Sequence, residues 1–200
     1  MIRALALALL LPGAALADPA QRIVSIGGSV TEIAAALGAA DRLIARDTTS
    51  TWPPQITGLP DVGYIRALSA EGVLALGPDM IVSEAGAGPR EAVEVLRAAG
   101  VPFVEMPGDP SPAGVLAKID AVAKALELEP AGAALRAKVA AGLAEAEARA
   151  AALTVPRKRV LFVLALQSGR VMAGGEGSSA EGIIHLAGGV NAAEGFRGYK

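Results

Sequence analysis

Short apolar runs alternate with segments of helical pattern over residues 22–106, and this alternation constrains the fold more than any other feature of the chain. We predict strands, each short and rich in Ile, Val, Leu or Met, at Ile23–Ile26, Leu43–Ala45, Met80–Val82 and 102–106. Ser29 is predicted to cap the first intervening helix, with Glu32 completing a capping box. Further helices are predicted over 69–76 and 89–99. This order predicts an α/β fold, in which helices cover both faces of a parallel sheet.

The pattern changes after Ser111, where two helices are predicted in succession. Ser111 caps the first, which runs to about Glu127, and the second runs from Pro130 to about Leu153 and is rich in strong helix formers. A helix of roughly 23 residues is about 35 Å long, the width of a small domain. We interpret it as a rigid spine between two α/β units; a surface helix of a single domain is the alternative.

A second α/β unit begins with a strand predicted over Arg159–Leu166, and its sequence resembles the first unit. The segment 27–33 precedes Leu37-Gly38, and the segment 177–183 likewise precedes Leu186-Ala187-Gly188. Two related lobes on either side of a cleft are expected from such a repeat. Because the second lobe has one clear strand and one helix before Lys200, we expect it to be incomplete. The expected division is 18–111 for the first lobe, 112–155 for the helical spine and 156–200 for the start of the second lobe.

The N-terminus has the pattern of an export signal. Arg3 precedes an apolar run over 4–11, and Ala15-Leu16-Ala17 provides the small residues of a signal-peptidase site. A run of about 8 residues is too short to cross a bilayer, which takes roughly 20. We therefore expect residues 1–17 to be cleaved and the protein to be soluble in the periplasm; a buried N-terminal helix is the alternative. No cysteine follows this site, so we expect no lipid anchor in the membrane.

Composition argues against several classes of function. The chain has no cysteine and one histidine, which excludes thiolate metal sites, cysteine nucleophiles and multi-histidine metal cages. A formal net charge of −2 gives no indication of nucleic-acid binding. Glycines over 175–180 fit a dinucleotide fingerprint only weakly, and we interpret them as a tight turn. No serine has a histidine or lysine arranged to activate it, so we predict that the protein is not an enzyme; an exported hydrolase is the weakest alternative.

Tyr64 is the most informative candidate for ligand binding. It lies between Gly63 and Arg66 in a segment expected to connect a strand to a helix, where ligands bind in parallel α/β folds. A tyrosine phenolate is a hard oxygen donor suited to ferric iron and is one of the few axial haem ligands. In an extended segment, Tyr64 and Arg66 would lie on the same side, so that Arg66 could reach the phenolic oxygen. The alternative is a tyrosine packed at the edge of a loop beside an exposed arginine.

Several segments resemble the substrate-binding proteins of ABC importers for iron chelates, haem and cobalamin. The resemblance rests on 22–33, Leu37-Gly38, Asp41-Arg42 and 74–82, and it covers roughly 22–200. Members of that family have two α/β lobes joined by one long spine helix. The segment 59–72, with Gly63-Tyr64-Ile65-Arg66 at its centre, is similar to the haem-binding branch of the family.

This resemblance implies a function and a set of site residues. It implies a monomer that binds haem and delivers it to the ABC transporter permease, with Tyr64 as the axial ligand of the iron and Arg66 as its hydrogen-bonding partner. Cobalamin or an iron siderophore is the alternative cargo. In the family, an acidic residue at the start of a helix on each lobe pairs with arginines of the permease, and Glu91 matches that position in the first lobe.

Other residues are weaker candidates. Tyr199 and Lys200 could face the haem from the second lobe. His185 is interpreted as an ordinary helix residue rather than an iron ligand, because it lies more than a turn from the start of its helix. Trp52 and Phe103 could contact the porphyrin, although a packing role is favoured for both.

Overall fold

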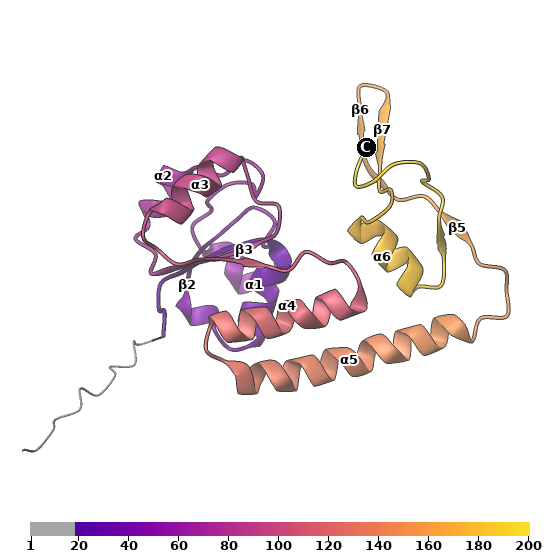
Figure 1. The fold of residues 1–200 in the computed structure, drawn as a ribbon, viewed down its shortest axis with the longest axis horizontal. Helices are drawn as coiled ribbons and strands as arrows, with labels where there is room; N and C mark the ends of the chain where they lie inside the picture. The colour runs from indigo at the N-terminus through magenta and orange to yellow at the C-terminus, as the bar shows by residue number, and fades with distance from the viewer. Residues whose placement is uncertain (1–18) are drawn as a thin grey trace, which may run out of the picture.

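The computed structural model describes residues 19–200, which form two lobes joined by a pair of helices (Figure 1). The predicted export signal lies outside the described residues. The first lobe contains a four-stranded sheet with helices above and below it, and the second lobe is smaller (Figure 1). Within residues 19–200, no helix combines the length and apolar character needed to cross a membrane.

The sheet of the first lobe is parallel throughout, as predicted. Its strands are β1 (Ile23–Ile26), β2 (Leu43–Arg46), β3 (Met80–Glu84) and β4 (Phe103–Met106), in the spatial order β2-β1-β3-β4. Successive side chains point to opposite faces of a strand, so that neighbouring residues of β1 enter different cores. Ile23 belongs to one buried cluster, whereas Val24 and Ile26 belong to another.

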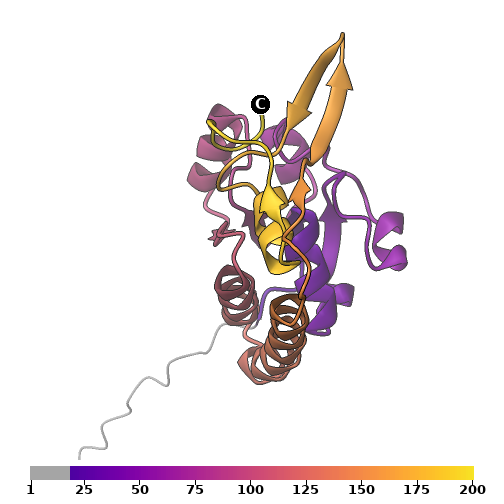
Figure 2. The same cartoon turned by 90° about the vertical axis from the view of Figure 1, so that its right-hand side faces the viewer.

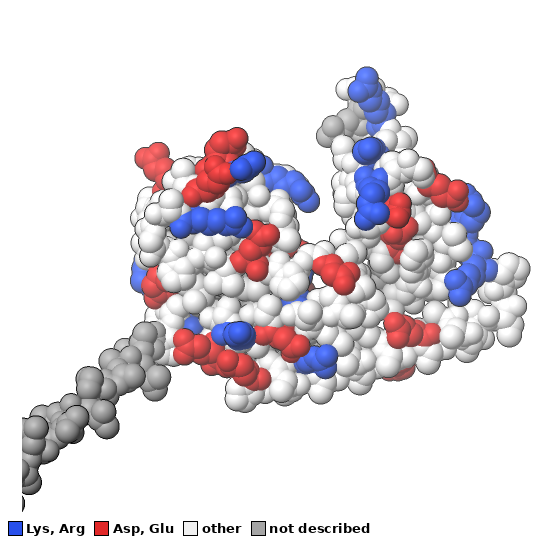
Figure 3. Space-filling model, in the orientation of Figure 1, with Lys and Arg blue, Asp and Glu red and all other residues white. Residues whose placement is uncertain are grey.

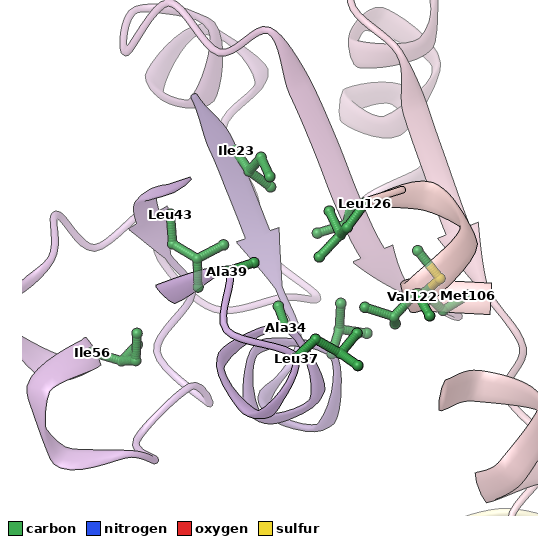
Figure 4. Packing of buried hydrophobic residues seen from close by; sticks show 12 residues of the cluster. Ile23, Ala34, Leu37, Ala39, Leu43, Ile56, Met106, Val122 and Leu126 are labelled. Carbon is green, nitrogen blue, oxygen red and sulfur yellow. The ribbon is translucent and has the colours of Figure 1, made fainter. Parts of the chain in front are cut away.

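Helices cover both faces of this sheet. On one face, α1 (Gly28–Ala36) and α4 (Pro112–Ala125) supply Ala34 and Val122 to the cluster shown in Figure 4, and their C-cap residues Leu37 and Leu126 join it. On the other face, α2 (Ala70–Leu74) and α3 (Arg90–Ala98) supply Val73 and Leu96. Two short 3-10 helices, η1 (Ala40–Arg42) and η2 (Pro54–Gly58), complete the first lobe.

The predicted capping of the first helix is wrong. Helix α1 begins at Gly28, and its N-cap is Gly27, which has φ of +105° and no side chain to form a cap. A Cβ at position 27 would lie 2.5 Å from the Cβ of Glu84, so close packing against β3 requires glycine there. Ser29 instead accepts a hydrogen bond from Lys118 at 2.9 Å. The cap predicted at Ser111 is confirmed, since its hydroxyl accepts a hydrogen bond from the N–H of Gly114, and Ser69 caps α2 in the same way through the N–H of Gly72.

The predicted long helix is α5 (Glu129–Ala151), which has 23 residues. It packs against α4 near its start, where Gly132 allows the two helices to approach closely: a Cβ there would lie 2.3 Å from the Cβ of Ala123. From this contact α5 runs to the second lobe (Figure 1).

The strand predicted over Arg159–Leu166 is divided in two, which corrects the prediction. Strand β5 (Arg159–Val160) pairs in parallel with β8 (Val190–Asn191), whereas β6 (Val163–Gln167) forms an antiparallel hairpin with β7 (Arg170–Ala173). The chain thus changes partner at Leu161-Phe162. Ser168 and Gly169, both with positive φ, form the two-residue turn of the hairpin, which projects from the lobe in Figure 2. Helix α6 (Ser179–Leu186) precedes β8.

Candidate functional site

The carboxyl edge of the first-lobe sheet faces the second lobe. The loop that follows β4 packs against α6: a Cβ at Gly182 would lie 2.5 Å from the carbonyl oxygen of Pro110. Figure 3 shows a hollow between the two lobes, with basic side chains along its second-lobe side. Loops at the carboxyl ends of parallel strands are the usual ligand sites of such sheets, and Tyr64 lies on one of these loops.

Tyr64 is accessible from solvent. Its residue is 47% exposed, and its phenolic oxygen has no hydrogen-bond partner among residues 19–200. Ile65, within the loop's turn, and Leu68, just after it, are buried in the core beneath α2 and α3. Apolar side chains therefore attach the loop to the core, whereas the phenol of Tyr64 is free to bind a ligand.

The backbone at Tyr64 forms a turn rather than an extended segment. The carbonyl of Tyr64 accepts a hydrogen bond from the N–H of Ala67 at 2.7 Å, and Ile65 and Arg66 are the central residues of this turn. The extended geometry from which we expected Arg66 to reach Tyr64 is therefore wrong, and no hydrogen bond joins the two side chains in the described part of the chain. Arg66 is exposed beside the loop after β3: a Cβ at Gly86 would lie 3.7 Å from its Nη1.

Tyr199 lies in the second lobe and contacts its own lobe. It is 37% exposed, pairs with Gly174 through a backbone bridge, and packs edge-on against Phe162, with the ring centroids 6.4 Å apart. Lys200 forms two backbone hydrogen bonds with Ala173. These contacts fix the segment to the strand that ends at Ala173 and leave part of the Tyr199 ring exposed.

The weaker aromatic and histidine candidates lie in different settings. Phe103 begins β4, at the end of the sheet opposite the lobe junction, and lies 5.4 Å from the guanidinium of Arg97, so its predicted packing role is confirmed. Trp52 is an exposed residue on the loop after β2. His185 lies in the last turn of α6 and lines a cavity of about 400 Å³ at the lobe junction.

Glu91 lies in the first turn of α3, where it is exposed and has no ion-pair partner within 19–200. A carboxylate in this position is stabilised by the helix dipole. Glu71 has the same setting in the first turn of α2 and is also exposed. The first lobe therefore carries two carboxylates that meet the description of a docking residue, of which sequence analysis singled out only Glu91.

Sequence analysis missed the polar groups that support the site. Asp47 is fully buried and accepts hydrogen bonds from the N–H of Gly27 and the hydroxyls of Thr49 and Ser50. Asp61 pairs with Arg46 at 2.7 Å. Asp61 lies in the segment 59–72 that contains Tyr64, but its partner Arg46 is 15 residues away, and only the course of the loop beside β2 brings the two together.

No group of three or more His, Cys, Asp or Glu residues in 19–200 could hold a metal ion. A cavity of about 850 Å³ lies in the second lobe, but it is lined mainly by aliphatic side chains of α5, α6 and the segment 155–162, without Tyr64. A metal carried within an organic chelate needs few protein ligands, and an exposed phenol is suited to supply one.

Comparison with known proteins identifies the family. A model of the periplasmic binding protein family matches residues 23–199. The chain belongs to this family.

Among solved periplasmic binding proteins, the haem-binding protein RhuT from Roseiflexus sp. RS-1, in its apo form, is 37% identical with a TM-score of 0.82. BhuT in complex with two haems is 39% identical with a TM-score of 0.84. In both comparisons the match covers 90% of this chain and 69% of the other. A curated vitamin B12-binding protein from Yersinia pestis is 34% identical over 87 residues, which are 44% of this chain and 31% of the relative, so the match spans about a third of that protein.

Proposed function

We propose that this chain belongs to a periplasmic substrate-binding protein that binds haem and delivers it to the permease of an ABC importer. The observation that carries the proposal is the exposed phenol of Tyr64, which has no partner within 19–200 and lies on a loop at the carboxyl edge of the sheet. The likeness to solved haem-binding proteins, at 37% and 39% identity, supports it. The protein performs no covalent chemistry on its cargo.

The phenolate of Tyr64 serves as an axial ligand of ferric haem. Ferric iron is a hard cation and favours such an oxygen donor, which is one of the axial ligands found in haem proteins. The side chain can bind the iron without breaking an existing hydrogen bond, and the phenol gives up its proton when it binds, a step that the charge of ferric iron favours. Basic side chains along the second-lobe side of the hollow in Figure 3 suit the anionic propionates of haem.

Arg66 and Tyr199 assist from the two lobes. Arg66 is a hydrogen-bonding partner of the iron-bound phenolate, a contact that requires its side chain to rotate from its place beside Gly86. Tyr199 faces the porphyrin from the second lobe, through the part of its ring that Phe162 leaves exposed. The spine helix α5 limits changes in the lobe arrangement, so binding causes little compaction.

Titration of the purified protein with haemin, followed by absorbance, tests the role of Tyr64. Tyr64→Phe removes only the donor oxygen, and we expect haemin affinity to fall by at least about 100-fold, the upper end of losses from groups that merely support a ligand. The Soret band at saturation should also shift. Tyr199→Phe is the matched control in the second lobe and should lower affinity less than about tenfold. Unchanged binding by Tyr64→Phe would contradict the proposal.

Cobalamin is the second candidate cargo, because a curated relative of 34% identity is a vitamin B12-binding protein. The solved haem-binding relatives match 90% of this chain at 37% and 39% identity, whereas the solved vitamin B12-binding protein BtuF of Vibrio cholerae matches 91% of it at 24% identity, which favours haem. The same titration with cyanocobalamin in place of haemin separates the two cargos. Binding of cobalamin without binding of haemin would establish the alternative.

Docking on the permease uses Glu91, which is free to pair with an arginine of the partner. Charge reversal in Glu91→Arg should abolish haem delivery to the transporter and leave haemin binding unchanged, since Glu91 is not among the Tyr64 loop residues. Glu71→Arg is the matched comparison, because Glu71 is also exposed, in the first turn of α2. Loss of delivery in Glu71→Arg alone would transfer the docking role to α2.

Export to the periplasm by cleavage after Ala17 belongs to the same proposal. The family to which the chain belongs is periplasmic, and the pattern over 1–17 fits a cleaved signal. N-terminal sequencing of the protein from a periplasmic extract should begin at Asp18, and its sedimentation should be that of a monomer. A retained Met1 would contradict cleavage.

A further inference from the structure

We propose that Asp61, paired with Arg46, is a positioning residue that fixes the direction in which Tyr64 points. The inference rests on the proposed role of Tyr64 as an iron ligand. It concerns groups that do not touch the cargo, and it follows from the course of the chain just before Tyr64.

The segment before Tyr64 pairs in parallel with the end of β2, beside the edge of the sheet. The N–H of Arg46 donates to the carbonyl of Pro60 at 3.0 Å, and the N–H of Val62 donates to the carbonyl of Arg46 at 2.9 Å. The N–H of Thr48 then donates to the carbonyl of Gly63 at 3.0 Å. These bonds attach the chain to β2 up to the residue that precedes Tyr64.

Both carboxylate oxygens of Asp61 accept hydrogen bonds that hold this segment beside β2. Its Oδ2 accepts from Nη1 of Arg46 at 2.7 Å, and its Oδ1 accepts from the N–H of Gly63 at 2.8 Å. Gly63 has φ of +91°, a conformation that favours glycine and that sets the direction of the following residue. The Asp61 side chain therefore links Arg46, at the end of β2, to Gly63, whose backbone conformation sets the direction in which Tyr64 projects.

Other contacts hold the side chain of Arg46 in place, so that it can fix the position of Asp61. Its side chain is only 14% exposed, and its guanidinium also donates to the carbonyl of Asp47 at 3.1 Å and to that of Thr57 at 3.4 Å. A largely buried charge depends on its counter-charge, because desolvation is costly without one. Asp61 is the only carboxylate within ion-pair distance of Arg46 in the described chain.

The other side of Tyr64 is held by different means. The N–H of Gly88 donates to the carbonyl of Ile65, and the N–H of Leu68 donates to the carbonyl of Gly88, both at 2.8 Å. These bonds and the buried side chains of Ile65 and Leu68 keep the loop in place without Asp61. Loss of the Asp61 contacts should therefore free the backbone at Gly63 and Tyr64 to change conformation and leave the rest of the loop folded.

Asp61→Asn tests the inference, because it removes the charge and keeps the size of the side chain. We expect haemin affinity to fall by about tenfold, as for other groups that orient a metal ligand. We also expect the absorbance spectrum of the saturated protein to shift toward that of Tyr64→Phe. Asp61→Glu retains the charge and should restore part of the haemin affinity and of the wild-type spectrum. Asp61→Ala also loses the hydrogen bond to Gly63, so its haemin affinity should be lower than that of Asp61→Asn.

Asp120→Asn is the matched control, because Asp120 forms an ion pair with Arg136 at 3.1 Å between α4 and α5. It should leave affinity and spectrum unchanged. Circular dichroism should be the same for both asparagine variants, so that a general loss of structure is recognised, whereas the urea midpoint should fall more for Asp61→Asn, because the largely buried Arg46 loses its counter-charge. An Asp61→Asn protein with the wild-type spectrum and affinity, in a series where Tyr64→Phe loses binding, would overturn this inference alone. Unchanged binding by Tyr64→Phe would overturn the proposed function instead.

Discussion

The two lobes differ in how they bury their apolar side chains. In the first lobe, a parallel sheet has helices on both faces, and its two clusters include side chains with no exposure, among them Ile23, Val24, Ile81 and Val82. In the second lobe, the strands form two separate two-stranded sheets. Large apolar side chains stay exposed there, including Leu161, Leu164, Leu166, Val171 and Ile183.

A sheet with both faces covered is where a precise ligand geometry can be built. A parallel sheet is stable only with both faces covered, and the first lobe meets this condition. Tyr64 lies on a loop attached to that covered sheet at both ends, whereas Tyr199 is attached to a strand of a small sheet. We therefore expect the first lobe to determine the iron ligand and the second lobe to contribute contact with the cargo.

The largest effect that tests this comparison is on stability. Ile81 is fully buried between β1 and β4, and Ile81→Ala should lower the free energy of unfolding by about 2–5 kcal/mol, because the deletion leaves a cavity in a packed core. Leu166 is 74% exposed on β6, and Leu166→Ala should cost about 0.5 kcal/mol or less. Urea denaturation measures both. A loss above about 1 kcal/mol at Leu166 would show that another surface covers the hairpin, and the contrast between the lobes would then be smaller than described.

Most of the first lobe could be predicted from the sequence because its signals are local. Four β-branched runs separated by Gly, Pro and serine caps define the strands and helices, and parallel pairing follows from their alternation. The division of Arg159–Leu166 between β5 and β6 could not be predicted. The run over 160–166 is apolar throughout, and only the partners, β8 and β7, distinguish its two parts. The cap of α1 was missed for a related reason, since the need for Gly27 comes from Glu84 on β3.

The site was predictable only in part. Tyr64 could be selected because tyrosine is rare in the chain and occurs beside Gly63 in a segment that connects a strand to a helix. The geometry expected for Arg66 was wrong because the periodicity of an extended strand was applied to a turn, which the hydrogen bond from the N–H of Ala67 to the carbonyl of Tyr64 defines. The pairing of Arg46 with Asp61 depends on the loop returning to lie beside β2, which no local pattern indicates.

The junction between the lobes should be sensitive to a single methyl group. Gly182 packs on the loop after β4, and a Cβ there would lie 2.5 Å from the carbonyl oxygen of Pro110. Gly182→Ala should therefore displace α6 and cost about 1–3 kcal/mol. Gly142→Ala, on the open surface of α5, is the control and should stabilise the protein by up to about 1 kcal/mol through helix propensity. Urea denaturation and small-angle scattering report the two effects. Equal stabilisation by both would show that the lobes are not in firm contact.

The smallest expected effect concerns pH at the same junction. The N–H and hydroxyl of Ser111 donate to the carboxylate of Asp109, at 2.9 and 2.8 Å, and these bonds hold the pKa of Asp109 below its ordinary value of 3.8. A carboxyl whose pKa is lowered by folding stabilises the folded state above its unfolded pKa, and this contribution is lost as the pH falls through the folded pKa. Asp109→Asn should therefore lower the urea midpoint slightly near neutral pH, and the difference from wild type should shrink as the pH falls below about 3.8. A difference that stays constant with pH would show that the charge of Asp109 does not stabilise the loop on which α6 rests.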